Sequence, residues 1–108
     1  MEKEIKENYI LFSEKKSFEN IVNFLESDLS EYSSDSLVVE VSELAISESQ
    51  LEKIHQLSNI HKQNGMSFVV VMSNVSADDV EDSLSVAPSM QEAIDIVTME
   101  DLERELGF

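Results

Sequence analysis

The sequence predicts an α/β fold in which a mostly parallel sheet of four or five strands is flanked by four or five helices. Short β-branched runs, typical of strands buried on both faces, alternate with segments whose apolar residues recur every three or four positions, as on one side of a helix. Short connections favour parallel strands joined by helices. Because 108 residues with 42% hydrophobic content suffice for one core, we expect residues 1–108 to form a single domain.

The first elements are predicted to be a hairpin followed by a helix. Residues 4–6 and 9–13 have the composition of two short strands separated by a tight turn. Ser17 then occupies a position typical of a helix N-cap. The apolar residues after it recur at helical spacing, and they are Phe18, Ile21, Val22, Leu25 and Leu29. We expect this helix to end at residues 33–35.

The middle of the chain predicts a strand, a helix and a second strand. Residues 36–41 are rich in valine and only partly alternating, as in a buried strand. Ser47 stands three residues before Gln50, which is the spacing of a capping box at a helix start. The helix should then place on its core side Leu51, Ile54, Leu57 and Ile60. Residues 67–72 form a continuous apolar run, which predicts a central parallel strand.

The last part predicts a short helix over residues 77–82, capped by Ser76, and a short strand over 84–87. Ser89 and Glu92 have capping-box spacing, and the helix after them carries an apolar stripe of Met90, Ala93, Ile94 and Val97. Thr98 and Asp101 have the same spacing, so we expect the helix to be interrupted there before it continues through Leu102.

The charge balance limits the kinds of partner. The chain has 23 acidic and 7 basic residues and a net charge of −16. Because lysine and arginine supply most of the affinity for phosphates, this surface should be repelled by nucleic acids and by anionic lipids. The acidic residues are spread along the chain. They either keep the protein in solution or steer it towards a basic partner.

The remaining composition favours a bacterial cytoplasmic protein. No run approaches the roughly 20 apolar residues that a membrane span requires. The first residues lack the apolar segment of a signal peptide, and the chain has no cysteine. We therefore expect neither membrane insertion nor disulfides.

No catalytic or cofactor motif is recognisable. Glycine-rich phosphate loops and a G-x-S-x-G elbow are absent from the sequence. His55 and His61 are six residues apart, which places them about 120° apart on a helix, so we expect ordinary surface or boundary residues. The acidic pairs 78–79 and 100–101 fall at expected helix starts, where they would complement the helix dipole. The sequence thus predicts a chain without enzyme activity, cofactor or metal, although a small enzyme with an unrecognised site stays an alternative.

From Val38 onward, the order of elements resembles the STAS family (sulfate transporter and anti-sigma factor antagonist domains). The stretch that carries the resemblance is Val38-Val39-Glu40-Val41-Ser42-Glu43-Leu44-Ala45-Ile46-Ser47-Glu48-Ser49-Gln50-Leu51. Glu40 and Ser42 stand where the family has an aspartate and a serine. Ser47 replaces the family's aspartate, Glu48 its phosphorylated serine and Gln50 its glycine.

This resemblance implies a protein-interaction and regulatory module like an anti-sigma factor antagonist, with an anti-sigma or kinase-like protein as partner. The residues that would bind this partner or regulate binding are Ser47, Glu48, Ser49 and Gln50. In the family, phosphorylation breaks the complex by adding charge. Glu48 would carry a fixed charge, so regulation by phosphorylation would have to occur at Ser47 or Ser49 instead. Alternatively, Ser47 only caps the helix and Ser49 is only solvated.

The end of the sequence, from Glu92 to Phe108, resembles small bacterial STAS-like proteins found beside ribonuclease Z. The zinc motif of that enzyme is absent from the sequence, so its activity is not implied. The resemblance suggests instead an alternative function, that of an acidic accessory subunit bound to a basic RNA-processing enzyme. The tail itself, Leu106-Gly107-Phe108, is either a helix stop with glycine in the left-handed conformation or a docking motif.

Overall fold

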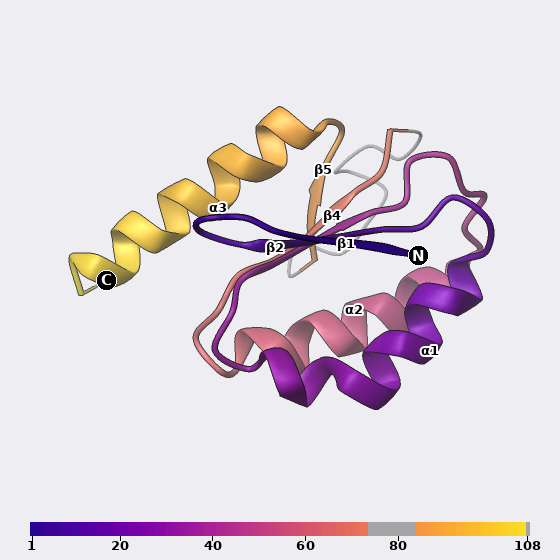
Figure 1. Ribbon diagram of the computed structural model, residues 1–108, viewed down its shortest axis with the longest axis horizontal. Helices are drawn as coiled ribbons and strands as arrows, with labels where there is room; N and C mark the ends of the chain where they lie inside the picture. Colours follow the sequence, from indigo (N-terminus) through magenta and orange to yellow (C-terminus); the bar gives the residue numbers. More distant parts are fainter. Residues whose placement is uncertain (74–83, 108) are drawn as a thin grey trace.

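The computed structural model describes residues 1–73 and 84–107, and these form a five-stranded sheet with helices on both faces (Figure 1). The strands are β1 (Glu2–Ile5), β2 (Ile10–Ser13), β3 (Leu37–Glu40), β4 (Phe68–Val71) and β5 (Ser85–Ala87). They lie in the order of the sequence, with β1 antiparallel to β2 and all other pairs parallel. The predicted mixed sheet and its N-terminal hairpin are confirmed.

The helices are α1 (Phe18–Asp28), α2 (Glu48–Lys62) and α3 (Met90–Glu105), and a 3₁₀ turn, η1 (Leu29–Tyr32), extends α1. Three α-helices in the described ranges are slightly fewer than the four or five predicted. The helix expected over residues 77–82 lies outside the described residues. Helices α1 and α2 cover one face of the sheet, and α3 covers the other (Figure 1).

Each face of the sheet has its own apolar core. Alternate residues of a strand point to opposite faces, so Val39 packs under α1 and α2, whereas its neighbour Val38 packs under α3. The larger core also contains Phe12, which lies against Phe24 with ring centroids 4.7 Å apart. The continuous apolar run at β4 is buried on both faces, as its composition predicts.

Helix α2 faces the core with a different side from the one the sequence suggested. Ile54 and Leu57 are buried as predicted, but Ile60 is 55% exposed and His61 is completely buried. Residues 54, 57 and 61 are three and four positions apart and therefore share one side of the helix, whereas position 60 is turned towards solvent. The predictions that Ile60 lies in the core and that His61 is a surface or boundary residue are wrong.

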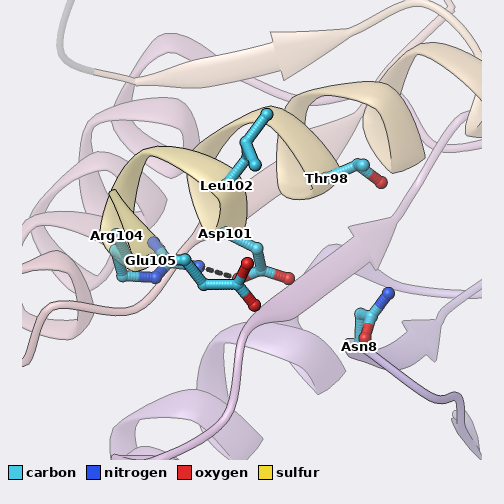
Figure 2. Close-up of a pocket in the computed structure, with 6 residues that line it drawn as sticks. All are labelled: Asn8, Thr98, Asp101, Leu102, Arg104 and Glu105. Atoms are coloured by element: carbon cyan, nitrogen blue, oxygen red, sulfur yellow. Dashed lines mark hydrogen bonds and ion pairs between the residues drawn. The ribbon is translucent and has the colours of Figure 1, made fainter. Parts of the chain in front are cut away.

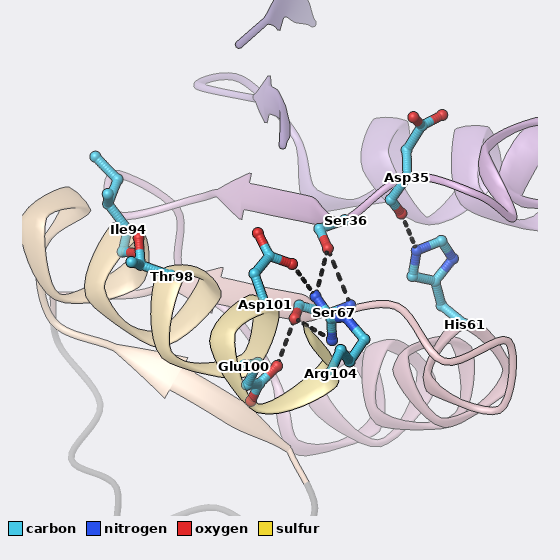
Figure 3. Close-up of polar contacts among 9 residues, drawn as sticks. All are labelled: Asp35, Ser36, His61, Ser67, Ile94, Thr98, Glu100, Asp101 and Arg104. Atoms are coloured by element: carbon cyan, nitrogen blue, oxygen red, sulfur yellow. Dashed lines mark hydrogen bonds and ion pairs between the residues drawn. The ribbon is translucent and has the colours of Figure 1, made fainter. Parts of the chain in front are cut away.

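Helix α3 is continuous through Thr98, so the predicted interruption is also wrong. The Thr98 hydroxyl donates to the carbonyl oxygen of Ile94 at 2.8 Å, a bond made within a helix, and it does not cap a new one. Glu100 and Asp101 consequently lie inside the helix and not at its start, and they contact Ser67 and Arg104 (Figure 3). The start of α3 at Ser89 agrees with expectation, and Ser89 Oγ accepts from the backbone N–H of Glu92, which is one of the two bonds of the predicted capping box.

Candidate partner-binding surface

The carboxyl ends of β2, β3 and β4 meet at one edge of the sheet because their registers pair Ser13 with Glu40 and Glu40 with Val71. The segment between β3 and α2 crosses this edge and leads into the first turn of α2. A cavity of about 260 Å³ opens beside it, lined by Val41, Ser42, Leu44, Ala45, Ile46, Met72 and Ser73. The structure thus places a mainly apolar hollow next to the polar helix start predicted to bind a partner.

The start of α2 is held by a complete capping box. Ser47 Oγ accepts from the backbone N–H of Gln50 at 3.3 Å, and the backbone N–H of Ser47 donates to Gln50 Oε1 at 3.0 Å. These bonds satisfy two backbone donors that would otherwise lack partners. The predicted capping role of Ser47 is confirmed.

The four candidate residues differ in how far they face solvent. Ser47, Glu48 and Ser49 are exposed, whereas Gln50 is half-buried, and its side-chain amide donates to Glu19 Oε1 on α1 at 3.2 Å. Ser49 Oγ lies 3.2 Å from Ser47 Oγ. Gln50 therefore links the two helices, and Glu48 and Ser49 present their side chains outward.

The loop before α2 is ordered by the residue that stands where the STAS family has its aspartate. Glu40 Oε1 accepts from the backbone N–H of Ser42 at 2.8 Å. The carbonyl oxygen of Ser42 accepts from Ser73 Oγ at 3.4 Å, which ties the loop to the residues after β4. A carboxylate at position 40 can therefore fix the turn that leads into the candidate surface.

A second carboxylate at the same edge belongs to Glu14, for which the sequence patterns predict no role. It is 2% exposed, and its Oε2 accepts from the backbone N–H groups of Lys16 and Ser17 at 3.0 Å each and from Asn20 Nδ2 at 3.1 Å. The Met1 ammonium lies 3.2 Å from Oε1. These contacts, led by the Ser17 amide, outweigh burial and hold the pKa of Glu14 at about 2. Glu14 thus fixes the residues that lead into α1, whereas the Ser17 side chain, at the predicted N-cap position, makes no capping bond.

The predicted docking tail lies away from this surface. Helix α3 covers the opposite face of the sheet, and its C-terminal end extends beyond the strands (Figure 1). Leu106 is 63% exposed, and Gly107 has a positive φ of 81°, which favours glycine at a helix end. Phe108 lies outside the described residues. The structure therefore does not bring the loop and the tail together.

Neither histidine contributes to a metal site within residues 1–73 and 84–107, which contain no group of three or more candidate ligands. His61 Nε2 lies 2.7 Å from the carbonyl oxygen of Asp35, and burial lowers the pKa of the ring although this bond opposes the shift. In the same described ranges, no helix has the length and apolarity to cross a bilayer.

Two solved structures share this architecture. A serine-to-glutamate variant of Moorella thermoacetica RsbS superposes with a TM-score of 0.69 at 14% identity, over 95% of this chain and 97% of that chain. The NMR structure of the protein TM1081 superposes with a TM-score of 0.67 at 17% identity, over 89% of this chain and 86% of the other. No family model and no curated protein matches the sequence.

These likenesses show that the chain has a STAS-like fold, as the resemblance from Val38 to Leu51 predicted. At such identities they concern the fold alone. Neither of them bears on ribonuclease Z, and an association with that enzyme stays a prediction.

Proposed function

We propose that the chain is a non-catalytic regulatory module that binds a protein partner in the manner of an anti-sigma factor antagonist. The observation that carries the proposal is the pairing of an exposed polar helix start with an apolar cavity at the same sheet edge. Interfaces commonly combine a hydrophobic centre with a polar rim. The cavity would accept an apolar side chain of the partner, and residues 47–50 would form the rim.

The chemistry of the rim supports a partner that tolerates negative charge. Glu48 stands where the STAS resemblance places the phosphorylated serine, and it is exposed in the first turn of α2. A glutamate carries about one negative charge, against the roughly −1.5 to −2 of a phosphoserine. In this proposal the charge at position 48 is permanent, and regulation falls to other residues.

Ser49 is better suited than Ser47 to such regulation. The Ser47 oxygen already serves the capping box, whereas Ser49 is exposed and its hydroxyl contacts only the neighbouring hydroxyl among the bonds described above. A phosphate at Ser49 would lie beside Glu48 and weaken binding to an acidic or apolar partner surface by repulsion and desolvation.

The test is a pull-down from the native cells with the tagged chain and two variants. Glu48→Lys reverses the charge at the candidate rim. Glu31→Lys makes the same change in the exposed part of η1, at a distance from this edge, and serves as the matched control. We expect a kinase-like or sigma-related protein that survives a high-salt wash and is lost from Glu48→Lys alone. Equal capture by both variants would remove residues 47–50 from the interface.

The wash also tests the alternative of an acidic accessory subunit. Interactions between exposed charges weaken as salt shortens the Debye length to about 3 Å at 1 M, whereas an apolar anchor in a cavity is much less affected. Capture of a basic RNA-processing enzyme that is lost at high salt would favour the alternative and contradict the proposal.

A further inference from the structure

On the second face of the sheet, a hollow of about 400 Å³ lies between α3 and the turn that joins β1 to β2. We call it the α3 groove. It is lined by Asn8 on the turn and by residues from the C-terminal half of α3, which are Thr98, Asp101, Leu102, Arg104 and Glu105 (Figure 2). Helix α3, which forms one wall of the groove, covers the opposite face of the sheet from α2 (Figure 1).

A stripe of exposed apolar side chains on α3 lies beside the groove and reaches it at one residue, Leu102. Met99 is 57% exposed, Leu102 49% and Leu106 63%. These positions are three and four residues apart and therefore lie on one side of the helix. Leu102 belongs both to the stripe and to the groove. Contiguous exposed apolar residues next to a hollow are typical of a surface that binds another protein.

Polar contacts of residues in the same half of α3 hold the helix on the sheet. The Arg104 guanidinium donates to Ser67 Oγ at 3.2 Å and to Ser36 Oγ at 3.4 Å, and it pairs with Asp101. Ser67 Oγ in turn donates to Glu100 at 2.5 Å (Figure 3). Since Ser36 and Ser67 immediately precede β3 and β4, this network fixes the helix on the sheet. A surface held in this way loses little conformational entropy when it binds, which favours affinity.

The lining of the groove carries more acidic than basic side chains. Asp101 and Glu105 line it together with one base, Arg104. Helix α3 as a whole carries six acidic residues and one basic residue. Arg104 pairs with Asp101, so Glu105 is the lining acid outside this ion pair. The groove therefore combines one apolar side chain, Leu102, with a net acidic lining.

We propose that the α3 groove is a second binding surface, and that its occupant is a cationic amphipathic segment of another protein. An apolar side chain of this segment would pack on Leu102, and its lysines or arginines would lie near Glu105. Charge complementarity selects this occupant. A second copy of this chain would bring a net charge of −16 against an equally negative surface. Because the groove and residues 47–50 lie on different parts of the molecule, one chain can bridge two partners.

An NMR titration of the isotope-labelled full chain tests the proposal, with a short helical peptide of leucine and lysine as the probe. We expect the peptide to shift amide signals of residues 98–106 and of the β1–β2 turn. Leu102→Ser should weaken binding about tenfold, the effect of losing one apolar anchor worth roughly 1.4 kcal/mol. Ile60→Ser removes a similarly exposed apolar side chain from α2 and should leave affinity unchanged.

Two charge-reversal variants test whether binding requires the acidic side chain of the groove. Glu105→Lys should weaken binding of the same peptide, whereas Glu31→Lys, with the same change in net charge, should not. Signal shifts spread evenly over the acidic surface, shifts centred on residues 47–51, or equal losses for Leu102→Ser and Ile60→Ser would each overturn the proposal. The proposed function is tested with the Glu48→Lys variant and a different partner, so either proposal can fail without the other.

Discussion

At the scale of single residues, Glu14 orders the start of α1 by accepting bonds from Lys16, Ser17 and Asn20. Sequence patterns point to Ser17 because capping preferences are local. They miss Glu14 because its role depends on burial at a sheet edge. The only hint in the sequence is that Glu14 directly follows an apolar strand. The sequence does not show which groups this carboxylate would contact.

Glu14 should make stability depend on acidity. Its pKa of about 2 lies below the ordinary value of 4.5, so the ionised carboxylate stabilises the fold above pH 4.5, and this contribution is lost as pH falls towards 2. Glu14→Gln should therefore lower the free energy of unfolding at pH 7, with a difference from the parent chain that shrinks between pH 4.5 and 2. Urea unfolding at several pH values measures this.

Glu52→Gln, in an exposed position on α2, is the matched control for this change and should have little effect at any pH. A Glu14→Gln variant as stable as the parent chain at pH 7 would show that the carboxylate does not hold α1.

His61 should produce a second pH dependence in a different range. Its pKa is lowered, chiefly by burial, and its Nδ1 has no hydrogen-bond partner among the described residues. The unfolded chain therefore takes up a proton near pH 6.5 that the folded chain resists, so stability should fall as pH drops below 6.5, by at most about 1.4 kcal/mol per pH unit.

The variant His61→Phe keeps an aromatic ring near Phe68 and should abolish this slope between pH 6.5 and 5, whereas His55→Gln should retain it. Unfolding by urea at closely spaced pH values distinguishes the two. An unchanged slope in His61→Phe would contradict the assignment.

At the scale of elements, the capping box of α2 separates two neighbouring serines. Ser47→Ala removes the acceptor for the Gln50 amide and should lower the free energy of unfolding by about 1 kcal/mol. Ser49→Ala leaves both bonds of the box in place and should change stability by only a few tenths of a kcal/mol. Thermal unfolding of both variants provides the comparison, and equal losses would show that the hydroxyl of Ser47 does not act as the cap.

Helix α2 also shows which features of an element are visible in a sequence. Its start follows from Ser47 and Gln50, because the bonds of a capping box join residues three apart. Its buried side cannot be read from the sequence, because two sets of residues have helical spacing. One set ends at Ile60, and the other, which is the buried one, ends at His61. The sheet decides between them by packing against residues 54, 57 and 61. Helix α3 is similar, since Thr98 fits both a cap and a helix interior.

At the scale of the whole molecule, the strand patterns were sufficient to predict a mixed sheet, and the stretch from Val38 to Leu51 was sufficient to predict a STAS-like fold. The cavity beside Leu44 and Met72 was not predictable, because it joins loops that are far apart in the sequence. The α3 groove was missed for the same reason. Both surfaces arise only when the sheet brings separate segments together.

The two surfaces suggest how an acidic chain distinguishes its partners. In our proposals the cavity beside residues 47–50 would select an apolar anchor, and the α3 groove would select a cationic segment. Salt screens the attraction between exposed charges. Binding at the groove should therefore weaken with salt more steeply than binding at the cavity. The chain would then respond to ionic strength at one surface while it keeps its partner at the other.

Hydrogen–deuterium exchange of the chain, alone and in complex with the partner retained after the high-salt wash, shows where that partner binds. We expect slower exchange in residues 44–52, across the loop and the first turn of α2, with α3 unchanged. Unaltered exchange at residues 44–52, with protection confined to α3 or to another surface, would contradict the claim that the partner binds at the start of α2.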